Sequence, residues 1–402
     1  INNLTPGLDS ITQIEWIYGD GNNTFVTPPT ATLIPNQTHV YNTQGVFTVR
    51  MAVTNQGQCT DTVSHQLVIS PFVNSYPYVE TFQTGTGNWY QEQPVIVPDS
   101  VAIWQRAQLL GNNINDPGNF AWVTRPSAPY TYNEGERAWV YSPCFDFTNA
   151  WRPMIVMDVW RDFLTDIDGA VLEFYDDWSN SWKPVGETGK GINWYQTDFL
   201  VARPGNQPNV TYPRGWTGES GTWEKARYRL DNLSGRPFVR FRVAFASDPN
   251  TVLEGHEGFA FDSVWIGERG RNVLVEHFSN HYHTNLQGTI MDVIDKMVYD
   301  TIYNSTNGRD VSLIQYQTNI QNVDPINAQF STDFDSRVLY YGINANSQIR
   351  IDGQTHGNGK SENLSQWQLE YDMLQFPVFN IQIDPLVFSG NTIQVNATAT
   401  AL

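Results

Sequence analysis

Hydrophobic and polar residues alternate most regularly between Phe47 and Val53. Every second residue there is apolar, and Thr48 and Arg50 stand between the apolar positions. A period of two is typical of a β-strand with one face in a core and the other in water. Trp16 is the large apolar residue of an earlier segment, and we expect it in the same core. The start of the chain therefore predicts a small β-sandwich.

A sharp turn is expected directly after Trp16. Gly19 and Gly21 flank Asp20 in the sequence Trp-Ile-Tyr-Gly-Asp-Gly. Glycine adopts positive φ at little cost, and this pattern indicates a turn that requires it.

The next region, from about Tyr78 to Gly267, consists of many short β-type segments separated by turn residues such as Asp168-Gly169 and Ser179-Asn180. This pattern favours an antiparallel two-sheet jelly roll. The clearest expected strands are 154–160, 170–175, 238–245 and 259–266.

The pattern changes after Arg271. An apolar strand broken only by Glu276 and His277 is expected over 272–278, and helical spacing of apolar residues over 286–303 follows it. Further strands are expected over 311–316 and 347–353, with a helix over 365–374. This order predicts a mixed α/β layer. Alternation returns between Phe379 and Thr400 and indicates the first strands of another β-domain.

The chain is thus predicted to be mainly β and multidomain. The expected domains are a sandwich over 1–70, a jelly roll over 76–268, an α/β domain over 271–377 and a fourth, β-type segment over 378–402. A length of 402 residues suits about two to four domains.

Composition narrows the classes of function. The formal net charge is −18, and only 16% of residues are charged. A surface that binds nucleic acid needs clustered Lys and Arg, and so does one that binds an anionic membrane. The sequence has no such cluster, so both partners are disfavoured. No apolar run reaches the ~20 residues of a membrane helix. The cysteines, Cys59 and Cys144, lack the spacing of a zinc ribbon or a dithiol redox site.

The first domain resembles the polycystic-kidney-disease (PKD) domain. The family's W-x-F-G-D-G and H-x-Y-x-x-x-G-x-Y-x-V motifs appear here as 16–21 and 39–49. The resemblance implies an extracellular location. Because PKD domains begin with a strand that is missing here, we expect the chain to be a piece of a longer protein. Cys59 resembles a cysteine that, in surface proteins of Bacteroidota, often pairs with a cysteine of that first strand.

The second domain resembles a MAM-type jelly roll of secreted Bacteroidota proteins. The matching segments include 142–147, 168–174, 193–195, 215–218 and 258–264. The resemblance implies export by the type IX secretion route, with other surface or secretion-system proteins as partners. Five D-[ST]-apolar triplets, at 9–11, 61–63, 99–101, 262–264 and 300–302, resemble the O-glycosylation signal of such glycoproteins.

The third domain resembles the thioredoxin-like domain of some Bacteroidota outer-membrane proteins. In that family a CxxC motif follows the first strand and a cis-proline faces it. Here His283 and Leu286 stand in the places of the two cysteines, and Ser347 in that of the proline. A dithiol exchanger needs both sulfurs, so the sequence predicts a degenerate redox site and no enzyme activity.

Two metal sites are conceivable from the sequence. Related jelly rolls hold a structural Ca²⁺ near the first and last strands. Glu80 and Asp262 match those places, and Asp158 is a third candidate ligand. Ca²⁺ needs six to eight oxygen ligands, which the fold would have to bring together. The alternative is that Asp262 caps a turn or binds buried backbone. The histidines His277, His281 and His283 could bind zinc or copper, or be polar loop residues left by the lost active site.

Aromatic residues suggest a further ligand class. Twelve of the 14 tryptophans of the chain lie between Trp89 and Trp265. Carbohydrate-binding jelly rolls stack sugars on exposed rings, and the surface candidates are Trp178, Trp182, Trp194 and Trp216. The alternative is that such rings fill the core of the sandwich.

The sequence therefore predicts a non-enzymatic structural or adhesion module of an exported surface protein. The alternative is a carbohydrate-binding accessory region of a secreted hydrolase, and a weaker one is a thiol oxidoreductase relative that has lost activity.

Overall fold

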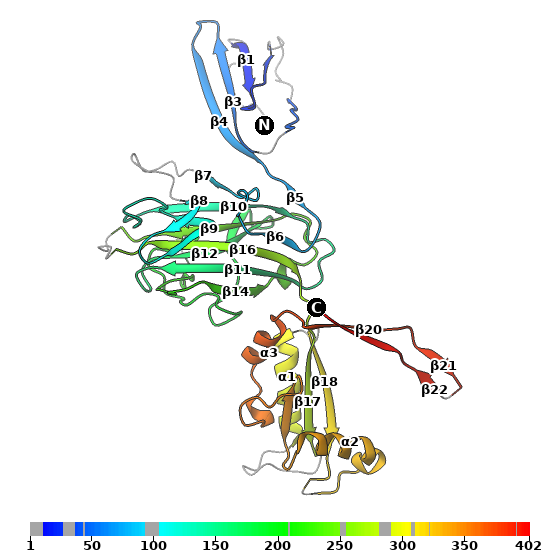
Figure 1. Cartoon of the computed structure of the whole chain (residues 1–402). Coiled ribbons are helices and arrows are strands. Elements are labelled where there is room, and N and C mark those ends of the chain that lie inside the picture. Colours follow the sequence, from blue (N-terminus) through cyan, green and yellow to red (C-terminus); the bar gives the residue numbers. More distant parts are fainter. Residues whose placement is uncertain are drawn as a thin grey trace. The chain divides into compact units, whose positions relative to one another are not determined.

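The computed structural model describes residues 11–26, 37–42, 45–92, 104–207, 210–249, 255–280, 291–306, 310–320, 322–390 and 392–402. The protein is mainly β and falls into two compact units (Figure 1). The first comprises residues 1–73 with 142–145, and the second comprises 74–141 with 146–402.

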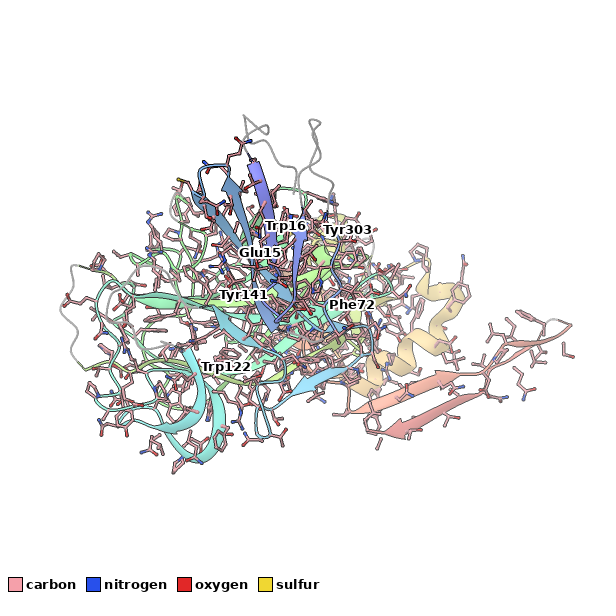
Figure 2. All side chains as sticks on the ribbon, turned by 90° about the horizontal axis from the view of Figure 1, so that it is seen from above. Glu15, Trp16, Phe72, Trp122, Tyr141 and Tyr303 are labelled. Carbon is pink, nitrogen blue, oxygen red and sulfur yellow. The ribbon has the colours of Figure 1, made fainter. Side chains whose placement is uncertain are left out.

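The first unit is built on a four-stranded antiparallel sheet in the order β2-β1-β3-β4. Ile14 and Trp16 of β1 are buried, and Trp16 is labelled in Figure 2. On β3, Phe47 is buried whereas Thr48 and Arg50 are exposed, which confirms the predicted alternation. The strands are β1 (Ile11–Ile17), β2 (Asn23–Val26), β3 (Gly45–Asn55), β4 (Thr60–Ile69) and β5 (Phe72–Val73).

The predicted turn after Trp16 is present. Gly19 and Gly21 have φ of 82° and 93°. His39 Nε2 lies 2.7 Å from Asp20 Oδ2, and this hydrogen bond lowers the pKa of Asp20 to about 2. Tyr41 donates a 2.9 Å hydrogen bond to the carbonyl of residue 18 and so ties a second segment to the turn.

The second unit begins with a β-sandwich. One sheet runs in the order β13-β12-β15-β10, with β7 paired to β10, and the other runs β14-β11-β16-β9-β8, with β6 paired to β16. The elements are β6 (Tyr78–Glu80), β7 (Tyr90–Glu92), β8 (Trp104–Leu110), β9 (Asn115–Thr124), β10 (Arg137–Phe145), β11 (Pro153–Asp162), β12 (Gly169–Asp176), β13 (Ser181–Pro184), β14 (Glu224–Arg229), η2 (Asp231–Leu233), β15 (Val239–Ala246) and β16 (Gly258–Glu268).

Aromatic rings fill the space between the two sheets. Phe163 stacks on Phe245 of one sheet and on Phe259 of the other, with ring centroids 6.0 Å apart in both pairs. Trp216, which is fully buried, stacks on Phe259 at 5.4 Å. Such contacts contribute beyond the area that they bury, so many of the aromatic residues are structural.

An α/β layer follows the sandwich. Its sheet has the order β18-β17-β19, with β17 parallel to β18 and antiparallel to β19. The elements are β17 (Val273–Ser279), α1 (Met291–Thr306), β18 (Val311–Gln317), α2 (Asn327–Tyr341), β19 (Gln348–Ile351), η3 (Ser361–Asn363) and α3 (Gln366–Met373). Helix α2 was not expected from the sequence, because its apolar residues are largely exposed and leave no clear buried stripe.

The sandwich and the α/β layer share a hydrophobic core. Met154 and Val156 of β11 pack in one cluster with Val273, Leu369 and other buried residues of the layer. Arg269 donates a 2.8 Å hydrogen bond to Asp310, and both side chains are 1% exposed. The outer side of β11 is therefore covered at its start, which explains the apolar run over 153–157.

The chain ends in two β-ribbons, β20–β23 and β21–β22. In the first, Phe379 lies opposite Ala401 and Ile381 opposite Ala399, so one face is apolar, and these strands are exposed. The strands are β20 (Phe379–Ile383), β21 (Val387–Ser389), β22 (Thr392–Gln394) and β23 (Ala397–Ala401). Within the described residues, no helix is long and apolar enough to span a membrane.

Candidate binding face of the sandwich

The four tryptophans expected at the surface have different environments. Trp178 is 87% exposed in the turn between β12 and β13, and Trp182 on β13 is partly exposed. Trp194 and Trp216 are 3% and 0% exposed, so the expectation that they lie at the surface is wrong. They pack on each other at 5.0 Å and belong to the aromatic interior of the sandwich.

Trp182 is part of a larger group on the outer face of one sheet. Tyr175 is its partner on β12, and their ring centroids are 5.4 Å apart. Tyr141 on β10 lies 5.5 Å from Trp182 and is labelled in Figure 2. Two arginines of β15 pack over these rings. Tyr141 and Arg242 are buried, and the other members of the group are partly exposed. We call this group the ring–arginine face and define it by Tyr90, Trp139, Tyr141, Tyr175, Trp182, Arg240 and Arg242.

The arginines lie over the rings at cation–π distances. The guanidinium carbon of Arg242 is 4.3 Å from the Trp182 ring centroid and 5.5 Å from that of Trp139. That of Arg240 is 5.2 Å from Trp182. Positions 240 and 242 share a face because side chains alternate along a strand. The same period places residues 139 and 141 together on β10.

A buried carboxylate fixes one of these arginines. Glu173 lies opposite Arg242 and accepts a 2.7 Å hydrogen bond from its Nε. The backbone N–H of Asn206 donates a second hydrogen bond of 2.6 Å to Glu173. Gly205 lies so close to this carboxylate that a Cβ there would overlap it. Burial raises the pKa of Glu173, and the charge of Arg242 opposes that shift.

Trp178 lies on the other side of β12. Arg236 packs 4.6 Å from the Trp178 ring centroid and 5.6 Å from that of Phe174. Arg236 also donates a 2.9 Å hydrogen bond to Asp176. Hydrogen bonds from Lys183, and next from Ser179 and Arg236, lower the pKa of Asp176. The two tryptophans that flank the turn thus belong to different surfaces, since Phe174 and Tyr175 point to opposite faces.

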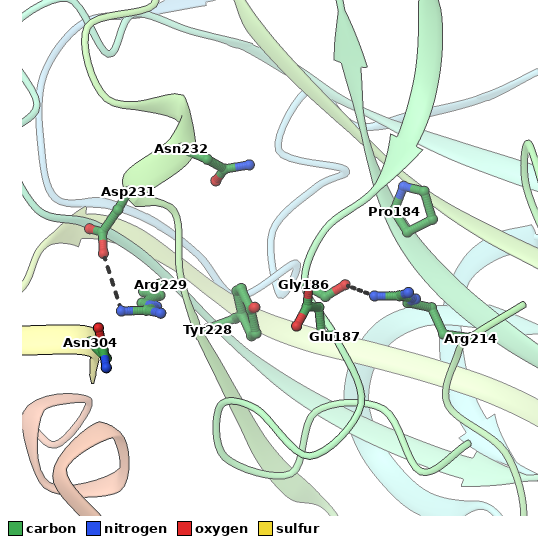
Figure 3. Close-up of a pocket in the computed structure, with 9 residues that line it drawn as sticks. All are labelled: Pro184, Gly186, Glu187, Arg214, Tyr228, Arg229, Asp231, Asn232 and Asn304. Carbon is green, nitrogen blue, oxygen red and sulfur yellow. Dashed lines mark hydrogen bonds and ion pairs between the residues drawn. The ribbon is translucent and has the colours of Figure 1, made fainter. Parts of the chain in front are cut away.

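A polar pocket of about 590 Å³ opens beyond β13 (Figure 3). Arg214 donates a 3.0 Å hydrogen bond to the carbonyl of Gly186, and Arg229 lies 3.9 Å from Asp231. Tyr228 packs against Trp194 at 5.1 Å, and burial raises the pKa of Tyr228 to about 12. Charges of both signs line the pocket, and the Trp194 ring beneath it is buried. We therefore regard the ring–arginine face as the stronger site for stacking.

The expected calcium ligands are only partly brought together. Asp158 and Asp262 lie opposite each other on β11 and β16. Lys225 Nζ lies 2.5 Å from Asp158, and burial raises the pKa of Asp262 to about 6. The side chain of Glu80 accepts a 2.7 Å hydrogen bond from the N–H of residue 82. Among the described residues, the three do not form a group with all ligand atoms within 4.8 Å.

Of the expected degenerate redox positions, Ser347 lies in the described part of the α/β layer. His283 and Leu286 fall outside the described residues. Ser347 is buried, and the peptide bond before it is cis. His277 Nε2 is 3.2 Å from Ser347 Oγ, and its Nδ1 is 3.6 Å from Asp295. Burial lowers the pKa of His277 to about 4. His281, the third histidine of the expected string, also lies outside the described part.

Sequence reasoning missed most of the ring–arginine face. The available signal was the i, i+2 spacing of Trp139 and Tyr141 and of Arg240 and Arg242. It also missed an ion pair of the buried Glu276, to which the partly exposed Arg337 donates hydrogen bonds of 2.6 and 3.0 Å. In the sequence, Glu276 only interrupts an apolar strand, and nothing local indicates its partner.

Comparison with known families bears on the first unit. Residues 3–69 match the PKD domain family. This segment is similar to PKD domains. The buried Trp16 and the Gly19–Gly21 turn of the PKD-like domain agree with the sequence motifs from which it was expected. No curated protein matches the chain.

Solved structures with some similarity include carbohydrate-binding modules and an adhesin domain. One is described as a carbohydrate-binding module of the β-sandwich superfamily, with 15% identity, a TM-score of 0.26, and coverage of 64% of this chain and 86% of that one. Another is the K1 cleaved adhesin domain of Lys-gingipain from Porphyromonas gingivalis W83, with 12% identity, a TM-score of 0.27, and coverage of 49% of this chain and 100% of that one. A third is the CBM22-2 xylan-binding domain of Paenibacillus barcinonensis Xyn10C, with 10% identity, a TM-score of 0.23, and coverage of 48% of this chain and 98% of that one. Scores this low carry no conclusion about function.

Proposed function

We propose that this chain is a non-enzymatic adhesion module of an exported surface protein, and that its ring–arginine face binds carbohydrate. One observation carries the proposal: Trp182 is partly exposed on a sheet surface, between two tyrosines and beneath two arginines. The PKD-like domain supports an extracellular setting.

The chemistry of the face suits a sugar ligand. An aromatic ring offers an apolar face to the C–H groups of a pyranose, while its polar edge and nearby side chains bind hydroxyl groups. Arg240 supplies N–H donors next to Trp182. Arg242 is fixed by Glu173, so part of the site is preorganised and its side-chain entropy is already lost before binding. Tyr, Trp and Arg are also the residues enriched at binding hot spots.

The test is a glycan array probed with the full chain and two matched variants. We expect binding that falls about tenfold or more in Trp182→Ala, because a hot-spot residue contributes more than about 1.4 kcal/mol. Trp178→Ala removes an exposed ring from the other side of β12 and should leave binding unchanged. Circular dichroism of each variant checks that the fold is retained.

Two results contradict the proposal. A silent array with folded protein would leave only a spacer or protein-contact role. Binding that is lost in Trp178→Ala and kept in Trp182→Ala would place the ligand at the β12–β13 turn.

A further inference from the structure

Three metal-ligating side chains meet at one end of the sandwich, away from the sites expected from the sequence. Asp162 ends β11, Glu219 lies in the loop before β14, and His256 lies two residues before the start of β16. One ligand atom from each of them lies within 4.8 Å of the others. His256 Nδ1 is 2.8 Å from Asp162 Oδ1. The fold thus brings together an imidazole and two carboxylates from three separate segments of the chain.

The buried member of this group is held in place by its neighbours. Asp162 Oδ2 accepts hydrogen bonds of 2.8 Å from Asn113 Nδ2 and 2.9 Å from the N–H of Glu257. The Glu257 carboxylate in turn accepts the N–H groups of residues 112, 113 and 114, at 2.7, 3.0 and 2.8 Å. These contacts orient Asp162 as outer-shell partners orient a metal ligand.

The other two ligands are also anchored. Glu219 forms an isolated antiparallel β-bridge with Asp162, so its position relative to that residue is set by backbone pairing. His256 is adjacent to Glu257, whose N–H binds Asp162. Glu219 is exposed and the His256 side chain is 14% exposed, so the group can be reached from solvent.

We propose that Asp162, Glu219 and His256 form a binding site for a divalent transition-metal ion of the zinc type. The donor set selects the ion, because imidazole suits zinc, copper and nickel, whereas calcium and magnesium prefer oxygen ligands throughout. Three protein ligands leave one position of a tetrahedral ion for water. Bound metal would replace the direct contact between His256 and Asp162 and cross-link the three segments. The site is independent of the ring–arginine face.

The test is calorimetric titration of the metal-stripped full chain with Zn²⁺, with Ca²⁺ as the contrasting ion. We expect one equivalent of Zn²⁺ to bind at this site and Ca²⁺ not to compete for it. Glu219→Gln and His256→Gln should each weaken this binding by at least about tenfold. Glu219 is exposed, so its variant is expected to remain folded. His65→Gln removes an exposed imidazole from the first unit and is the matched control.

A second readout separates this site from the histidines near His277. In protein loaded with Co²⁺, the visible absorption of the ion should change in His256→Gln and remain in the double variant His281→Gln, His283→Gln. Zn²⁺ binding that is unaffected by Glu219→Gln and His256→Gln, or the absence of stoichiometric binding, would overturn the assignment.

Discussion

Arg242 Nε donates a 2.7 Å hydrogen bond to Glu173 Oε2 across neighbouring strands of the sandwich, and both side chains are buried. The pair therefore differs from the exposed ion pairs of this chain, such as Lys225 with Asp158, where the lysine side chain is 47% exposed. A buried pair loses much more when one partner is removed, because the other charge stays in a poorly solvated place.

Arg242→Ala is expected to lower the free energy of unfolding by about 3–5 kcal/mol, since it leaves the Glu173 carboxylate without its cation. Lys225→Ala, the control at the exposed pair, should cost less than about 1 kcal/mol. Urea unfolding followed by tryptophan fluorescence measures both. Equal costs in the two variants would show that the Glu173–Arg242 pair is not buried in solution.

The turn of the PKD-like domain offers a matched pair of glycines. A Cβ at Gly19 would lie 2.8 Å from the backbone N and O of Thr48, whereas a Cβ at Gly21 meets nothing within 4 Å. Both residues have positive φ. Gly19→Ala should therefore destabilise the domain by about 2–4 kcal/mol, and Gly21→Ala by about 1–2 kcal/mol, the cost of backbone strain alone.

Thermal unfolding of the chain, with the transition of the first unit followed separately, compares these two variants. The interpretation fails if Gly21→Ala is as damaging as Gly19→Ala, because the close approach to Thr48 would then have no effect.

His277 should make the α/β layer less stable in acid. Its pKa is lowered to about 4 by burial, below the usual value of 6.5. The unfolded chain therefore binds its proton first, and stability is lost as pH falls from about 6.5 to about 4. A shift of this size corresponds to about 3 kcal/mol. Above pH 6.5 the contribution is constant.

The check is the free energy of unfolding of the wild type and His277→Gln at several pH values. The difference between them should change over this window and level off above it, because glutamine does not titrate. A difference that is constant with pH would mean that His277 keeps its ordinary pKa in the folded chain.

Asp262 allows a test of the proposed calcium site. Without metal, burial raises its pKa to about 6, so stability from this group is present at low pH and lost as pH rises from 3.8 to about 6. Asp262→Asn should then stabilise the chain at pH 7 by about 1–2 kcal/mol, after allowance for solvent screening.

Calcium reverses this expectation if Glu80, Asp158 and Asp262 bind it. Addition of Ca²⁺ should raise the Tm of the wild type and have little effect on Asp262→Asn. Wild-type protein whose Tm does not respond to Ca²⁺ would contradict the calcium proposal and leave Asp262 as a buried carboxylic acid.

The elements with strict alternation could be predicted from sequence, because burial of one face fixes the period. Phe47 on β3 is an example. Helix α2 could not, since apolar residues such as Leu339, 79% exposed, do not mark a buried stripe. Hydrophobic periodicity in the sequence indicates which residues belong to one element. A helix without an apolar face gives little of this periodicity and is therefore hard to predict.

The binding face was only partly predictable for a different reason. Trp182 and Trp216 are the same type of residue, and the sequence around them does not distinguish their environments. In the structure Trp182 is partly exposed, whereas Trp216 is fully buried between the sheets. Which face of a strand points outward depends on the packing of the second sheet. Likewise, Asp162, Glu219 and His256 are separated by 57 and 37 residues, and no sequence motif with local spacing could join them.

The shared core of the sandwich and the α/β layer determines how this segment carries mechanical load. In the proposed role as part of a surface protein, the chain would be pulled along its length. Only the few residues between Glu268 and Val273 connect β16 to β17. Buried contacts fix this connection to both the sandwich and the α/β layer, and the ion pair of Arg269 with Asp310 is one of them. Tension is therefore transmitted from one layer to the next without a flexible hinge, and we expect both to rupture together as one stiff link.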